Sequence, residues 1–254
     1  MRAYPEKIFI QGKAFYYEKI LKDDFFSVNV LYKNREEVRY VLKLSDFRFF
    51  LGSLLKPLAM FFSWREYKIY KKLEGIEGIP PLGPRFGKRG YLHRYIEGKT
   101  LHDMEQGGSL PDDFFPRLET IISQVHERRI FYLDLNKRGN IIVGEDMQPH
   151  LIDFQVSLFI GKKKGLWGLI ADRVFNGLIR EDMYHLCKHK RHFQPHLMTE
   201  EELALATRTP FNEGLNRYVG APYRKVKRLI YPHGSNEIVW YKWKKMKDRS
   251  KRMP

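Results

Sequence analysis

The stretch YLDLNKRGNIIVGEDMQPHLIDFQ, residues 132–155, holds two aspartates, Asp134 and Asp153, beside short apolar runs. An ionised carboxylate beside Ile and Leu side chains is costly unless a cation meets it. The runs IIV and LIDF are joined by the turn GEDMQ, which predicts a β-hairpin. Because the outer ends of a hairpin lie side by side, we expect Asn140 and Asp153 to face each other. An amide oxygen and a carboxylate suit Mg²⁺.

Asp134 lies on the loop before this hairpin, where it could accept a proton from an attacking hydroxyl. Taken one at a time, these residues have ordinary explanations as well. Either aspartate could cap a turn, and Asn140 could be a plain loop residue.

Composition indicates a globular protein with an anionic partner. The 254 residues are 43% hydrophobic and 15% aromatic, enough for one large domain or two lobes with a core. The net charge of +16 favours a phosphate-bearing substrate, a nucleic acid or an acidic membrane surface, and charge alone does not choose among them. The single cysteine, Cys187, excludes an internal disulfide and cysteine-based zinc sites, and fits a reducing compartment.

No segment of the sequence predicts a membrane span. The first residues, MRAYPEKIFI, lack the layout of a signal peptide. The most apolar stretch, residues 47–64, is interrupted by Arg48, Lys56 and Pro57. It therefore falls short of the roughly 20 apolar residues that a spanning helix needs. We expect a cytoplasmic protein, with a peripheral contact to the inner face of the membrane left open.

The N-terminal part predicts strands followed by a helix. The segments KIFI, KAFYYEKIL, FFSVNVLYK and VRYVLKLS are β-rich and separated by turn signals. Pro57 suits the first turn of a helix, and Gly75 suits its C-cap. One face of this helix carries Phe62, Glu66, Ile69 and Leu73.

The rest of the chain predicts a strand, a hinge and mainly helices. The strand GYLHRYIEG runs into a hinge near residues 94–98. Residues 111–130 repeat apolar side chains at helical spacing, and residues 165–254 look mostly helical and increasingly basic. This layout, a β-rich N-terminal part with one helix and a helical C-terminal part, predicts an α+β fold.

Lys43 and Glu66 are charged residues in apolar surroundings. Lys43 alternates with Val41 in a strand, and Glu66 lies within the apolar face of the helix. A carboxylate there favours a cationic partner, so Glu66 could hold Lys43 against a phosphate. The alternatives are that Lys43 lies on a solvated face and that Glu66 pairs with a neighbour such as Arg65 or Tyr70.

In this order, the motifs resemble those of the protein-kinase-like superfamily. VLK resembles the strand lysine motif, REYKIYKKL the helix with its glutamate, LHRYIEG the hinge, YLDLNKRGN the catalytic loop, and IDFQ the Asp-Phe-Gly motif. The match covers roughly residues 15–160. It implies a two-lobed fold, with residues 1–96 as a β-rich N-lobe containing one helix and residues 97–254 as a mostly helical C-lobe.

The resemblance also implies roles for single residues in binding ATP and Mg²⁺. Lys43 would contact the α and β phosphates, and Glu66 would orient it. The main chain of Arg94 and Ile96 would bind the adenine. Asp134 would be the catalytic base, and the metal ligands would be Asn140 and Asp153.

Several positions depart from the pattern of ordinary protein kinases. The glycine-rich loop is absent, Gln155 replaces the last glycine of Asp-Phe-Gly, and the catalytic loop is one residue longer than usual. Asn136 stands where a lysine is common, so Lys137 or Arg138 would supply that charge. Asp182 would brace the loop from a helix. Among the atypical branches, the sequence most resembles the bacterial lipopolysaccharide kinases, the Kdo and heptose kinase group, which is sometimes classified with the RIO-like kinases.

The expected function is therefore an ATP-dependent kinase that phosphorylates a sugar hydroxyl of a lipopolysaccharide-type or other small anionic substrate. Two alternatives stay open: a RIO-like Ser/Thr protein kinase acting near a ribonucleoprotein, and a non-catalytic pseudokinase scaffold. An anionic glycolipid or sugar is the expected partner, and RNA is another.

Three segments could touch an anionic membrane. Residues 47–64 could insert at the interface or pack on the N-lobe. Residues 161–175 mix lysines with Leu, Trp and Val, and could meet a lipid head group or form a solvated charge run. The tail YKWKKMKDRSKRMP could bind membrane or RNA, or be disordered.

Overall fold

A six-stranded sheet with one helix forms the N-terminal part of the structure. The computed structural model describes residues 4–23, 27–45, 56–162 and 164–207. The sheet is antiparallel throughout, with strand order β1-β2-β3-β4-β6-β5. Its strands are β1 (Lys7–Ile10), β2 (Lys13–Asp23), β3 (Ser27–Asn34), β4 (Arg39–Ser45), β5 (Leu82–Phe86) and β6 (Gly90–Arg94). The predicted strands are confirmed.

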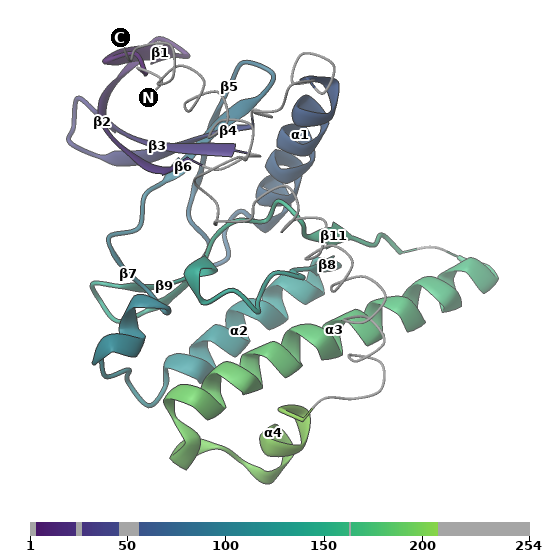
Figure 1. The fold of residues 1–254 in the computed structure, drawn as a ribbon. Helices are drawn as coiled ribbons and strands as arrows, with labels where there is room; N and C mark the ends of the chain where they lie inside the picture. The colour runs from purple at the N-terminus through teal and green to yellow at the C-terminus, as the bar shows by residue number, and fades with distance from the viewer. Residues whose placement is uncertain (1–3, 24–26, 46–55, 163, 208–254) are drawn as a thin grey trace, which may run out of the picture.

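The helix α1 (Lys56–Leu73) packs against β4 and β6, as Figure 1 shows at the top of the molecule. Gly75 follows it with φ +83°, the left-handed conformation that ends many helices. Residues 46–55, which hold much of the apolar segment 47–64, lie outside the described residues.

The two faces of the sheet differ in chemistry. One face is an apolar core with β1, formed by Ile8, Ile10, Phe15, Val28, Val30, Tyr32, Leu42 and Leu92. The other face, toward α1, alternates with it along each strand. On β4 this second face carries Val41 and Lys43, whose partners on β6 are His93 and Tyr91. A charged residue is therefore placed on the face that α1 covers.

The C-terminal part is helical around short strands (Figure 1). Its strands are β7 (Gly98–Thr100), β8 (Ile130–Phe131), β9 (Ile141–Gly144), β10 (Pro149–Leu151) and β11 (Leu158–Phe159). Its longer helices are α2 (Phe114–Glu127) and α3 (Gly165–Phe193), followed by the short α4 (Glu200–Leu205). The 3-10 turns are η1 (Asp103–Gln106), η2 (Arg138–Asn140) and η3 (Pro195–Leu197).

The apolar face predicted for α2 is buried as expected: Phe114, Leu118, Ile121, Ile122 and Val125 all lie in the main core. This core also takes up Ile69 and Leu73 of α1. The same cluster therefore joins the helix of the N-terminal part to the helices below it.

The connection between the two parts runs from Arg94, the end of β6, to Gly98, the start of β7. Gly98 has φ +155°, and a Cβ there would collide with the carbonyl oxygen of Val143. Glycine is needed at this point because β7 approaches β9 closely. The division into domains at residues 96 and 97 falls within this connection and stays a prediction.

No helix among the described residues is both long enough and apolar enough to cross a bilayer. Cys187 is a free, buried cysteine. The basic tail YKWKKMKDRSKRMP, for which the sequence leaves contact with membrane or RNA open, lies outside the described residues, which end at residue 207.

Candidate active site

Lys43 is a buried ammonium held by two carboxylates. Its Nζ lies 2.7 Å from Glu66 Oε1 and 2.7 Å from Asp153 Oδ1. Lys43 is 4% exposed and Glu66 is fully buried, so the alternative of a solvated lysine is excluded. Burial opposes the charge, but Asp153 and Glu66 together raise the pKa of Lys43 and keep it protonated.

Arg65, the alternative partner of Glu66, makes different contacts. Its guanidinium donates to the carbonyl oxygens of Gln155, at 3.0 Å, and of Ser157. Gln155 and Ser157 lie shortly after Asp153 in the chain, on either side of Val156. Two neighbouring residues of α1 therefore hold the segment around Asp153. Glu66 acts through its ion pair with Lys43, and Arg65 binds the main chain of the segment directly.

A column of aromatic rings fixes the residue after Asp153. Phe154 is fully buried between Tyr70 of α1, at 4.9 Å between ring centroids, and Tyr132, at 5.0 Å. The Tyr132 hydroxyl donates to the carbonyl oxygen of Ile152. Asp153 itself has φ +64°, an uncommon value for a residue with a side chain. The packing of Phe154 and the ion pair with Lys43 together stabilise this strained conformation.

The hairpin forms as predicted and brings Asn140 next to the Asp153 segment. β9 and β10 pair with Leu151 opposite Ile141, and the ladder continues with Ile152 N–H donating to Asn140 O at 3.0 Å. The Asn140 amide nitrogen donates to Asp134 Oδ2 at 3.0 Å. Burial and the nearby charges of Asp153 and Asp134 raise the pKa of Tyr132.

Lys137 supplies the cation that Asn136 cannot. Its Nζ lies 2.5 Å from Asp134 Oδ2, and its side chain is 55% exposed. Arg138, the other candidate, pairs with Glu105 of η1 instead. Of the two residues left open by the sequence, Lys137 is the one beside Asp134.

Asp182 of α3 holds the loop that leads to Asp134. Its carboxylate accepts hydrogen bonds from the N–H of Tyr132, at 2.9 Å, and of Leu133, at 3.1 Å, and lies 2.9 Å from His126 Nε2. His189, also on α3, contacts the carbonyl oxygen of Leu135 at 2.7 Å through Nε2. The long helix therefore holds this loop from two sides, and Leu133 keeps φ +68°.

The donor set fits a divalent cation. Glu66, Asp134 and Asp153 bring three carboxylates, and Lys43 and Lys137 pair with them directly. The Asn140 amide donates through its nitrogen to Asp134, and within the described residues nothing donates to its oxygen. A carboxylate and an amide oxygen are hard ligands of the kind Mg²⁺ takes. Among the described residues no group of three or more His, Cys, Asp and Glu side chains forms a metal site by itself.

The hinge offers fewer main-chain groups than the sequence implied. The N–H of Arg94 donates to Pro81 O at 2.9 Å, and His93 Nδ1 lies 2.9 Å from the carbonyl oxygen of Arg94. Both main-chain groups of Arg94 therefore already have a partner, and only its carbonyl oxygen has a second lone pair to offer an adenine. Within the described residues no group bonds the main chain of Ile96. Both assignments stay predictions.

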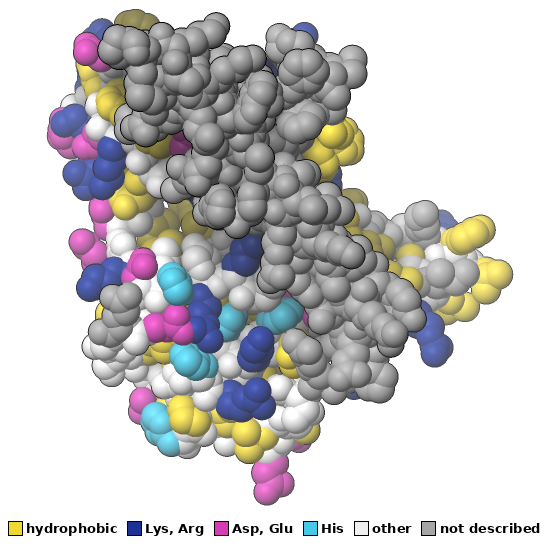
Figure 2. Space-filling view, viewed as in Figure 1, with side chains coloured by type: hydrophobic (Ala, Val, Ile, Leu, Met, Phe, Trp, Pro, Cys, Tyr) yellow, Lys and Arg dark blue, Asp and Glu magenta, His cyan; other side chains and the backbone are white. Residues whose placement is uncertain are grey.

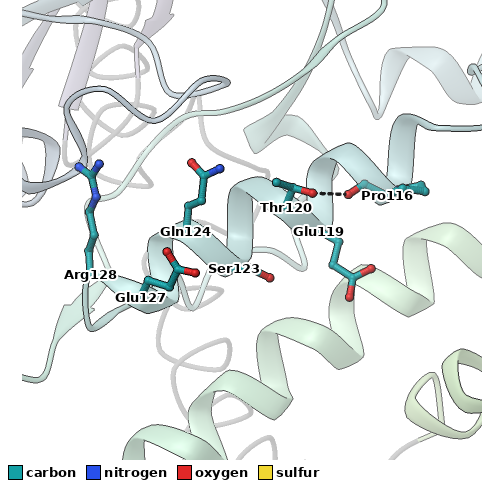
Figure 3. Close-up of a pocket in the computed structure, with 7 residues that line it drawn as sticks. All are labelled: Pro116, Glu119, Thr120, Ser123, Gln124, Glu127 and Arg128. Atoms are coloured by element: carbon teal, nitrogen blue, oxygen red, sulfur yellow. Dashed lines mark hydrogen bonds between the residues drawn. The ribbon is translucent and has the colours of Figure 1, made fainter.

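One open depression on the described surface lies away from this site. It measures about 620 Å³ and runs along the outer face of α2 (Figure 3), lined by Pro116, Glu119, Thr120, Ser123, Gln124, Glu127 and Arg128. None of these residues belongs to the cluster around Lys43. The Thr120 hydroxyl donates within the helix to Pro116 O at 3.0 Å, so part of this lining is already satisfied.

Comparison with solved structures gives the fold. The chain superposes on the BubR1 kinase domain with a TM-score of 0.53, and the match covers 76% of this chain and 66% of that one at 13% sequence identity. The fold is protein-kinase-like. It is an α+β fold with a β-rich N-terminal sheet, one helix and a helical C-terminal part. The sequence matches no protein-family model and no curated protein.

Sequence reasoning missed several residues of this kinase-like site. It did not find that Arg65 binds the Asp153 segment, that Lys43 contacts Asp153 directly, or that His189 supports the loop. Arg65 had a usable signal, because it follows Trp64 on the same helix as Glu66 and is a cation next to the apolar stripe. His189 had none, because its partner is a main-chain carbonyl.

Proposed function

We propose that the protein is an ATP-dependent phosphotransferase. One observation supports it most: Lys43, Glu66 and Asp153, which come from a strand, a helix and a loop far apart in the chain, form a single ion cluster in which Lys43 and Glu66 are buried and Asp153 is 21% exposed. Buried charges of this kind are expensive to keep, and they cluster at functional sites. The protein-kinase-like fold makes a nucleotide the ligand of choice.

The residues of the chain would act mainly by position and charge. Lys43, held by Glu66, would bind the phosphates of ATP, and Lys137 would neutralise the transferred phosphoryl group. Asp134 would accept the proton of the attacking hydroxyl, and the hydrogen bond from Asn140 would orient its carboxylate. Mg²⁺, held by Asn140 and Asp153, would supply electrostatic stabilisation of the phosphate oxygens.

We infer that the acceptor is a hydroxyl on an anionic sugar or glycolipid, as in the lipopolysaccharide kinase group. The net charge of +16 favours an anionic acceptor. Figure 2 shows Lys and Arg side chains below the sheet, interspersed with His side chains and with some Asp and Glu side chains. Lysine and arginine side chains near Asp134 would attract an acceptor that carries phosphate or carboxylate groups and raise its local concentration.

A peripheral contact with an anionic membrane would bring such an acceptor to the site. The first turns of α3 expose Leu166, Trp167 and Leu169, each at least 70% exposed. Figure 2 shows hydrophobic side chains at the tip on the right, where α3 begins in Figure 1. Lys162 and Lys164 precede them. Exposed Trp and Leu beside lysines are typical of interfacial helices. Replacing Trp167 and Leu169 by Ser should therefore reduce sedimentation with anionic vesicles and not with zwitterionic ones.

A phosphotransfer assay tests the function. The protein and its Asp134→Asn variant are incubated with labelled Mg-ATP and a cell-envelope extract, and the product is separated into lipid, sugar and protein fractions. Label in lipid or sugar that depends on Asp134 supports the proposal. Label in protein alone would support the RIO-like protein kinase instead.

The absence of a glycine-rich loop motivates the pseudokinase scaffold as a further outcome. A thermal-shift measurement with Mg-ATP separates the two cases. A ligand at 100 times its Kd stabilises the folded state by about 2.7 kcal/mol. No transfer together with no shift would support the scaffold and contradict the kinase.

A further inference from the structure

We propose that Lys22 of β2 is a phosphate-binding residue of the nucleotide site and takes the place of the glycine-rich loop that the sequence lacks. This inference rests on the proposed ATP-dependent function. In sites with a glycine-rich loop, main-chain N–H groups surround the phosphates. A lysine side chain can bind the same oxygens as a mobile point charge with three donors.

The strand register places Lys22 in one row with Lys43. Lys22 of β2 is the partner of Asn29 on β3, and Asn29 is the partner of Lys43 on β4. Directly paired residues of antiparallel strands point to the same face of the sheet. The three side chains therefore share the face that carries the Lys43–Asp153 ion pair.

An irregularity in β2 produces this alignment. The pairing of β2 with β3 shifts between Ile20, opposite Val30, and Lys22, opposite Asn29. Leu21 is the extra residue of this bulge. In a regular strand without this bulge, Lys22 would lie two residues after Ile20 on the same face. It would then share the face of Val30, which belongs to the apolar core with β1. The bulge turns a lysine toward the site at the point where the strand ends.

The neighbouring row on the same face is apolar and suits an adenine ring. Leu31 of β3 is the partner of Val41 on β4, and Val41 is the partner of His93 on β6. His93 directly precedes Arg94, where the hinge begins. A nucleotide whose base lies against this row would extend its phosphates toward the row of Lys22, Asn29 and Lys43.

The lysines of the site agree with this placement. Lys43 Nζ lies 2.7 Å from Asp153 Oδ1, and Lys137 Nζ lies 2.5 Å from Asp134 Oδ2. Lys43 comes from β4, Lys22 from β2 and Lys137 from the loop before η2. The sheet and the loop therefore both supply ammonium groups, as a bound triphosphate would require.

Asn29 gives the row a polar side chain whose oxygen could accept a hydrogen bond from a ligand hydroxyl or a bound water. Its side-chain oxygen is buried and has no hydrogen-bond partner in the part of the chain that the structure describes. A buried polar atom without a partner is costly, and such atoms often mark a ligand position. The atom lies between Lys22 and Lys43 in the sheet.

Calorimetric titration of the full-length protein with Mg-ATP and with adenosine tests the role of Lys22. Lys22→Gln should weaken Mg-ATP binding about tenfold, which corresponds to about 1.4 kcal/mol, and leave adenosine binding unchanged. Lys22→Arg should restore most of the affinity. Lys13→Gln removes the same charge from the same strand outside the row, and it should change neither ligand.

Two outcomes would contradict the inference, and they differ. If the wild type binds Mg-ATP and Lys22→Gln binds it within twofold, Lys22 has no phosphate role while the proposed function stands. If the wild type binds no Mg-ATP, the proposed function is wrong and the inference falls with it.

Discussion

The carboxylate of Asp182 in α3 accepts a hydrogen bond from the N–H of Tyr132 at 2.9 Å, across 50 positions of the chain. Its second oxygen accepts from Leu133, whose φ is +68°. A buried carboxylate thus holds the strained backbone that leads into Asp134. The phosphotransferase proposal needs this, because a catalytic base works only if its geometry is fixed.

Asp182→Asn should therefore cost both stability and turnover. An amide can accept from only one of the two N–H groups and leaves the contact with His126 incomplete. We expect a loss of about 3–5 kcal/mol in the free energy of unfolding, as for a broken buried charge network. Denaturant titration measures it. Asp172→Asn, on the same helix but 55% exposed, should change stability by less than about 1 kcal/mol. Equal effects of the two substitutions would contradict the bracing role.

The buried pair of Lys43 and Glu66 should behave as a coupled unit. Lys43→Met leaves two carboxylates without their cation, and Glu66→Gln weakens the orientation of the lysine. The double variant should be more stable than the sum of the two single losses predicts, by about 0.5–3 kcal/mol. A double-mutant cycle in denaturant gives this number. Strict additivity would mean that the two side chains do not stabilise each other.

Stability should fall in mild acid because two histidines are buried. Burial lowers the pKa of both His93 and His189 from 6.5 to about 4. Between these values the unfolded chain binds more protons than the folded one, so the free energy of unfolding decreases as the pH falls from 6.5 toward 4. Each histidine accounts for roughly 3 kcal/mol at the lower end.

His189→Gln tests this, because the glutamine amide can still donate to Leu135 O. Its free energy of unfolding should fall less than that of the wild type between pH 6.5 and 4.5. The same slope in both proteins would show that His189 does not take part in the acid sensitivity.

From the sequence it was possible to predict which residues lie close together, but not all the contacts that they make. Lys43 and Glu66 could be paired in advance, because a lysine in an apolar strand and a carboxylate in an apolar helical stripe need each other. The hairpin predicted that Asn140 would adjoin the Asp153 segment, because a hairpin fixes its own ends. In both cases one local pattern contains the information.

Other contacts depend on register and docking, which no local pattern contains. The loop spacing left Lys137 and Arg138 equivalent, and only the position of Glu105 on η1 separates them. Lys22 lies on the same face of the sheet as Lys43 because of a bulge in β2, and no feature of the sequence predicts this bulge. Likewise, the N–H of Arg94 donates to the carbonyl oxygen of Pro81, the residue before β5, and the place of β5 beside β6 becomes evident only in the folded sheet.

The most direct test of the central claim compares nucleotide binding and phosphoryl transfer in the wild type and Asp134→Asn. Binding of Mg-ATP is measured by calorimetry, and transfer to an accepted hydroxyl substrate in a single turnover. We predict that both proteins bind Mg-ATP with similar affinity and that the variant transfers about 100- to 10,000-fold more slowly. Full transfer by Asp134→Asn, or no binding of Mg-ATP by the wild type, would contradict the proposed site.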